Sequence, residues 1–166
     1  MGNRYLIVPG LPQQYRASHA AWVETAELFN DLCERLAPNN LRVGYHNHSH
    51  EFEPMDGEAP WDTFFGRTRT EVIMQLDTGN AMHGGASPVR ILKRYAGRAV
   101  TVHLKKYSST NERALLGEGD VPWWRVFGLC EITGATEWYI VEQETYPFRP
   151  LECVRRCLAN LRALGR

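Results

Sequence analysis

The chain has 166 residues, of which 43% are hydrophobic and 23% are charged, and its 19 Lys and Arg residues balance its 19 Asp and Glu residues. This composition is typical of a folded globular domain, and the neutral balance gives no whole-chain field that would recruit nucleic acid or anionic lipid. The chain also has no apolar stretch long enough for a membrane span or a signal peptide. We therefore expect a cytoplasmic protein with a single domain over residues 1–166 and with neither nucleic acid nor membrane as a partner.

Strand patterns and helix patterns alternate along the chain, beginning with an apolar run at residues 5–10 that predicts a strand. Apolar side chains at helical spacing predict a helix over residues 20–36. After the breaker at residues 38–40, residues 41–45 form the next apolar run and predict a second strand. A short helix is expected over residues 61–65, beyond a loop.

The same alternation continues to the C-terminus. We expect strands over residues 72–77, 99–104 and 138–142, and helices over residues 88–95, 121–132 and 150–164. Thr78 and Gly79 are expected to stop the third strand, and Gly134 to follow the helix at 121–132. Each connection is long enough for a right-handed crossover, so the sequence predicts an α/β fold with five parallel strands.

Four of these five apolar runs end in a metal-ligand residue type. His46 and His48 come directly after the second run, and Asp77, His103 and Glu142 lie at the ends of the third, fourth and fifth. Because the carboxyl ends of parallel strands lie on one face, we expect these side chains to converge. Mixed histidine and carboxylate ligands suit a divalent ion such as Mn²⁺, Co²⁺, Zn²⁺ or Mg²⁺.

Two of these residues also have structural interpretations. Asp77 has the position of a cap for the turn at Thr78 and Gly79, and Glu142 is within reach of a salt bridge to Lys105 or Arg149. The convergence of four strand ends favours the metal site over these separate roles.

The strand-end motifs resemble a known family. The motifs YHNHSHEF, QLDTGNAMHGG, VHLKK and YIVEQE, together with GEGDVPWW, are similar to those of the sugar phosphate isomerase/epimerase family of xylose-isomerase-like TIM barrels. The resemblance covers nearly the whole chain and implies a partial (β/α)₈ barrel. An entire barrel takes eight strands and about 250 residues. The match begins at the fourth strand, so the first three strands are expected to be lacking, and either a preceding segment or a second copy would complete the barrel.

The resemblance also implies a ligand set and a cofactor. Family members bind one divalent metal, here expected to be Mn²⁺, with two glutamates, an aspartate and a histidine. Asp77, His103 and Glu142 match three of these ligands. For the first glutamate, Glu51 is favoured over His46, because a glutamate keeps the charge of the set.

The implied activity is isomerisation or epimerisation of a small sugar, keto-sugar or polyol, through C–H proton transfer and a metal-stabilised enediolate. Glu142 and Glu51 would be the catalytic base and acid. His46, His48, Lys105 and Glu118 are the expected substrate-binding residues. His83 is a candidate to cover the site, whereas Lys106 is expected to point outward because it follows Lys105 in a strand. A polyol dehydratase, a non-catalytic remnant that binds metal or sugar, and a metal-dependent DNA endonuclease of the same barrel type are the alternatives.

Overall fold

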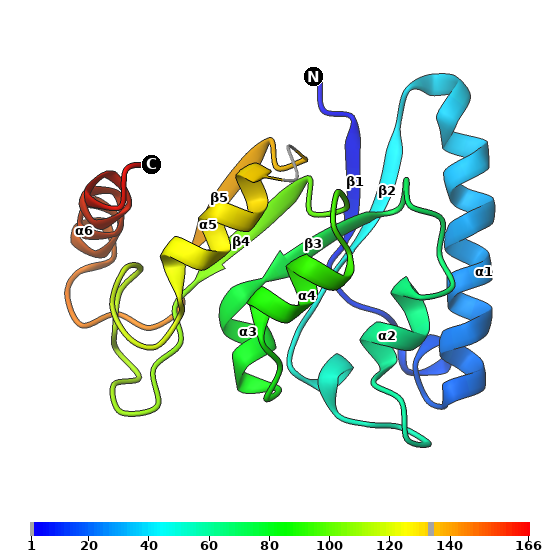
Figure 1. The fold of residues 1–166 in the computed structure, drawn as a ribbon, viewed down its shortest axis with the longest axis horizontal. Helices are drawn as coiled ribbons and strands as arrows, with labels where there is room; N and C mark the ends of the chain where they lie inside the picture. Colours follow the sequence, from blue (N-terminus) through cyan, green and yellow to red (C-terminus); the bar gives the residue numbers. More distant parts are fainter. Residues whose placement is uncertain (1, 133–134) are drawn as a thin grey trace.

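A five-stranded parallel sheet forms the centre of the computed structural model, which describes residues 2–132 and 135–166 (Figure 1). The strands are β1 (Tyr5–Val8), β2 (Arg42–His46), β3 (Ile73–Asp77), β4 (Thr101–Lys105) and β5 (Trp138–Glu142). They lie in the order β1-β2-β3-β4-β5, and every neighbouring pair is parallel. Five parallel strands in sequence order, joined through helices, form part of a (β/α)₈ barrel, which confirms the predicted fold class.

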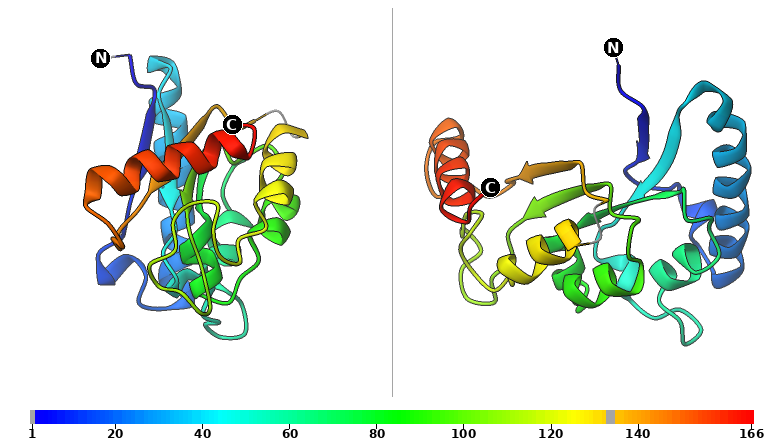
Figure 2. Two further views of the ribbon diagram at one scale, coloured as in Figure 1. Left: turned by 90° about the vertical axis from the view of Figure 1, so that its left-hand side faces the viewer. Right: turned by 45° about the horizontal axis from the view of Figure 1, so that its top comes forward.

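Helices α1 to α5 connect the strands and lie along one face of the curved sheet, and α6 follows the last strand (Figure 2). They are α1 (His19–Leu36), α2 (Pro60–Phe65), α3 (Thr78–His83), α4 (Pro88–Arg94), α5 (Trp123–Ile132) and α6 (Pro150–Ala163), with 3₁₀ turns η1 (Gln13–Tyr15), η2 (Ala37–Asn39) and η3 (His50–Phe52). The predicted strands and helices are confirmed with small shifts at their ends. The expected role of Gly134 lies outside the described residues.

Among the α-helices of the described residues, α3 is the one that the sequence pattern did not predict. Strand β3 ends at Asp77, before Thr78 and Gly79, as expected, but these two residues also open this helix directly after the strand. Asp77 is its N-cap, because a carboxylate oxygen accepts a hydrogen bond from the backbone N–H of Asn80 at 2.7 Å. The turn therefore continues into a helix, which brings α3 over the carboxyl end of the sheet.

An aromatic core fixes α1 and α2 against β2. Ser18 caps α1, and the buried face of that helix places Trp22 and Phe29 against the strand. The ring centroids of Phe29 and Phe64 lie 4.9 Å apart at 85°, and Trp22 meets Tyr45 edge-on at 5.9 Å. Burying each large apolar side chain contributes about 1.5–3 kcal/mol, so this cluster holds the strand whose end carries His46.

Strand alternation separates the core from the site. Val43, Met74 and Val102 belong to the helix-facing hydrophobic core. On the opposite face, Gln75 donates a hydrogen bond from its amide to the hydroxyl of Thr101 at 2.9 Å. Because successive side chains alternate between the two faces, strand residues in register with Gln75 and Thr101 point into the barrel interior.

The two edge strands expose apolar side chains: Leu6 of β1 is 44% exposed and Trp138 of β5 is 61% exposed. The hydroxyl of Tyr5 nevertheless donates to the carboxylate of Glu137, which links the start of β1 to the residue before β5. The homodimer or preceding segment expected to complete the barrel stays a prediction.

In the described part of the chain, no helix has both the length and the apolar character to cross a membrane.

Candidate metal centre

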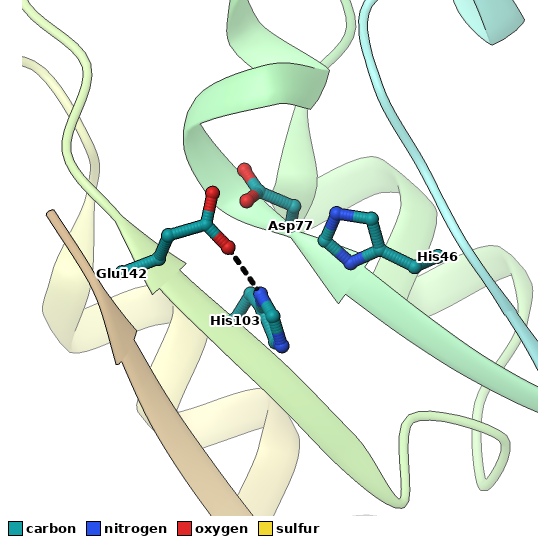
Figure 3. A group of neighbouring side chains, drawn as sticks. All are labelled: His46, Asp77, His103 and Glu142. Atoms are coloured by element: carbon teal, nitrogen blue, oxygen red, sulfur yellow. Dashed lines mark hydrogen bonds and ion pairs between the residues drawn. The ribbon is translucent and has the colours of Figure 1, made fainter. Parts of the chain in front are cut away.

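Four side chains from four adjacent strands meet at the carboxyl end of the sheet (Figure 3). They are His46 of β2, Asp77 of β3, His103 of β4 and Glu142 of β5, and one ligand atom from each lies within 4.8 Å of the others. All four stand on the inner face, as the alternation of the strands requires. Residues separated by 96 positions in the chain, from 46 to 142, therefore form one compact donor set.

Two atoms of this group are buried and lack a partner among the described residues: Nδ1 of His46 and Oδ2 of Asp77. Burial lowers the pKa of His46 to about 4, with help from His103 and His48, so its imidazole is neutral at pH 7 and keeps a lone pair. Burial also raises the pKa of Asp77 to about 7. A divalent cation would satisfy both atoms and favour the ionised carboxylate, so the donor set fits such an ion.

Asp77 combines the two roles that the sequence suggested for it. Its Oδ1 accepts from the backbone N–H of Asn80 and caps α3, which leaves Oδ2 facing the group. The fully buried Asn47 holds the strand ends in place, because its Oδ1 accepts from the N–H of Asp77 at 2.8 Å and its Nδ2 donates to the carbonyl of Asp77 at 3.1 Å. Sequence analysis missed Asn47, although its position between His46 and His48 was the available signal.

Glu142 is held by two neighbours. Its Oε2 lies 2.6 Å from Nδ1 of His103, and its Oε1 accepts from Nζ of Lys105 at 2.9 Å. Burial acts to raise the pKa of Glu142, but the hydrogen bonds from Lys105 and His103 outweigh it and hold this pKa below its usual value. Glu142 is therefore a carboxylate at neutral pH, and the salt bridge to Lys105 coexists with its place in the group.

The structure does not bring Glu51, the favoured first ligand, into this group. Glu51 is fully buried, and its oxygens accept from the hydroxyl of Tyr45 at 2.6 Å and from the N–H of His48 at 2.8 Å. Tyr45 points to the helix side of the sheet because it precedes His46 in the strand. Glu51 lies on that same side, hydrogen-bonded to Tyr45, and therefore away from the donor set. His46, the weaker alternative in the sequence analysis, takes the place in the donor set.

The other predicted binding residues are dispersed. His48 is exposed beside the group, with its ring centroid 5.3 Å from that of His46. Glu118 is exposed and folds back on its own loop, where it accepts from the N–H of Leu115 at 2.9 Å. Lys106 was expected to point outward, but it is only 8% exposed and lines a cavity beside Glu142. Strand β4 ends at Lys105, so strand alternation no longer sets the direction of Lys106. Substrate contact by His48 and Glu118 stays a prediction.

A half-barrel of parallel strands with a histidine and carboxylate donor set at its carboxyl end defines a class of α/β-barrel protein. Residues 1–164 match the family of xylose isomerase-like TIM barrels. The chain belongs to this family.

The curated relatives include two named functions. An inosose dehydratase of Clostridium tetani is 28% identical over 152 residues, and the match covers 79% of this chain and 50% of that protein. The rhizopine catabolism protein MocC of Rhizobium meliloti is 25% identical over 89% of this chain and 50% of its own length. The chain therefore spans about half the length of the curated relatives it matches.

Solved structures show the same fold. A sugar phosphate isomerase/epimerase from Parabacteroides distasonis superposes with a TM-score of 0.83 at 24% identity, covering 96% of this chain and 59% of that one. An L-ribulose 3-epimerase superposes with a TM-score of 0.59 at 15% identity, covering 95% of this chain and 54% of that one. At these identities the likeness concerns the fold alone.

A pair of substitutions separates the roles of His46 and Glu51. His46→Ala is expected to remove most bound metal, whereas Glu51→Gln is expected to retain it and to lower the free energy of unfolding by about 1–3 kcal/mol, since a buried hydrogen-bonded network is disturbed. Elemental analysis of protein purified without chelator, together with urea unfolding, measures both effects. Loss of metal from Glu51→Gln with retention in His46→Ala would restore Glu51 as the ligand.

Proposed function

We propose that this chain carries the metal centre of an enzyme that moves a C–H proton on a small sugar, keto-sugar or polyol, as a sugar isomerase or epimerase does. The observation that supports it is the convergence of His46, Asp77, His103 and Glu142 with two buried, unpartnered donor atoms. These four residues would hold the cation, with Mn²⁺ as the expected ion. A bound divalent ion supplies Lewis acidity that acidifies a C–H bond next to a carbonyl group.

The residues of the chain supply the proton transfer. Glu142 accepts the proton, because its hydrogen bonds to Lys105 and His103 keep it ionised at neutral pH. Lys105 positions that carboxylate through the 2.9 Å contact to Oε1. His48, exposed at the mouth of the site, is placed to contact substrate hydroxyl groups.

Dehydration of a polyol ketone is the second candidate function. An epimerase that works from both faces of the substrate needs a second proton-transferring group, for which Glu51 was the candidate. In the described residues Glu142 is the one glutamate of the donor set, and His46 stands where a second was expected. A single base that removes the proton next to the carbonyl suffices when a neighbouring hydroxyl then takes up that proton and leaves as water. The inosose dehydratases among the relatives have this activity by name.

One screen tests both candidates. The metal-loaded chain is incubated in D₂O with ketoses and with cyclic polyol ketones, and NMR follows deuterium incorporation and loss of water. We expect exchange of the C–H next to the carbonyl for an isomerase or epimerase, and an unsaturated product for a dehydratase. Chelator-treated protein is the control and should show neither. Metal bound at one equivalent with no exchange and no dehydration would favour a binding module.

A further inference from the structure

A cavity of about 200 Å³, lined by polar residues, adjoins the metal centre. Glu142 lines it from the side of the donor set, and Lys105 and Lys106 line it from the segment where β4 ends. His83 at the end of α3 also borders it. A ligand that reaches the donor set therefore has an adjacent space that contains two lysines.

The two lysines differ in how their charges are compensated. Nζ of Lys105 lies 2.9 Å from Glu142 and 2.5 Å from Glu144, so this ammonium is shared between two carboxylates. These ion pairs compensate the charge of Lys105 and hold Glu142 in position. Lys105 is therefore a poorer candidate than Lys106 for holding a substrate anion.

Lys106 has no such compensation. It is only 8% exposed, and Nζ donates to the backbone carbonyl oxygen of Glu112. In the described part of the chain no carboxylate lies within 4.0 Å of this ammonium. Burial accordingly lowers the pKa of Lys106. A buried ammonium is unfavourable unless an anion or a full set of hydrogen bonds compensates it.

We infer that Lys106 binds an anionic group of the substrate, a phosphate or a carboxylate, while the donor set acts on the hydroxy-ketone end. A lysine binds such oxygens as a compact charge with several donors. Three carboxylates also border the cavity, those of Glu112, Glu142 and Glu144. Glu112 and Glu144 are exposed, so water screens their repulsion of an anion, and the charge of Glu142 is paired with Lys105. This inference rests on the proposed function for the identity of the substrate, and it makes Lys106 the residue that selects charged over neutral substrates.

The first test measures anion binding without metal or turnover. Inorganic phosphate is titrated into the metal-free chain, and the protein's amide NMR signals report binding. Lys106→Met keeps the side-chain length and removes the charge, and Lys93→Met makes the same change at an exposed lysine of α4. We expect phosphate affinity to fall roughly tenfold or more in Lys106→Met alone, as the loss of a charged hydrogen bond predicts. Equal affinity in both variants would overturn the inference.

The second test uses matched ligands on the metal-loaded chain. D-fructose is the neutral reference, D-fructose 6-phosphate carries a phosphate, and 5-keto-D-gluconate carries a carboxylate. Calorimetry is expected to show at least roughly tenfold tighter binding of one charged ligand, an advantage that Lys106→Met removes and Lys106→Arg largely keeps. Tightest binding of the neutral ketose would overturn the inference.

The experiments can refute the anion site and the proposed function independently of each other. If phosphate binding depends on Lys106 but no ketose exchanges deuterium, the anion site stands and the proposed activity does not. Thermal unfolding checks that each variant is folded, and Lys106→Gln replaces Lys106→Met if the apolar side chain prevents folding.

Discussion

Asp77→Asn is expected to reduce bound divalent metal from about one ion per chain to near zero. An amide is a poor substitute for the ionised carboxylate, while its oxygen can still accept from the N–H of Asn80 and keep the cap of α3. Loss of affinity should exceed about a hundredfold, since even residues that only orient a ligand contribute 10–100-fold. Elemental analysis and metal titration by calorimetry measure it.

The matched control is Asp31→Asn, the same change at an exposed position of α1. It should leave metal content unchanged. Measuring the free energy of unfolding distinguishes a loss of metal binding from a loss of folding. Without metal, Asp77→Asn should be no less stable than the unaltered chain, because the substitution removes a carboxylate that burial disfavours. With metal, the unaltered chain should gain stability that the variant does not. Equal metal content in Asp77→Asn and in the unaltered chain would refute the proposed centre.

Glu142→Gln is expected to lower deuterium exchange or dehydration by roughly 10²- to 10⁴-fold, the contribution that a positioned general base makes. Glutamine keeps the length of the side chain and can accept a hydrogen bond from Lys105, but it cannot take the substrate proton. The loss should therefore lie mainly in kcat. Single-turnover NMR at saturating metal measures the chemical step.

Glu144→Gln is the comparison, because Glu144 also contacts Lys105 but is 63% exposed and lies outside the donor set. It should retain most of the activity. A comparable loss in both variants would assign the effect to the position of Lys105 instead of to proton transfer at Glu142. Full activity in Glu142→Gln would exclude it as the base.

Local pattern was sufficient for the strands and for the convergence of the donor set. The alternation of side chains along a strand is a property of each segment, so the apolar runs predicted all five strands, and their polar ends placed His46, Asp77, His103 and Glu142 on one face. The resemblance to the family added the partial barrel. These features depend on short-range geometry that every parallel sheet shares.

Tertiary structure alone decided the features that lie beyond the strand ends. Glu51 accepts from the hydroxyl of Tyr45, and Lys106 turns inward to the carbonyl of Glu112, so the direction of each side chain is set by the hydrogen-bond partner that the folded loop presents to it. Asp77 caps α3 as its position in the sequence suggested, but the sequence pattern indicated a turn there and not a helix. A strand repeats its geometry every two residues, whereas a loop has no period, so its side-chain directions follow from the buried partners that it finds.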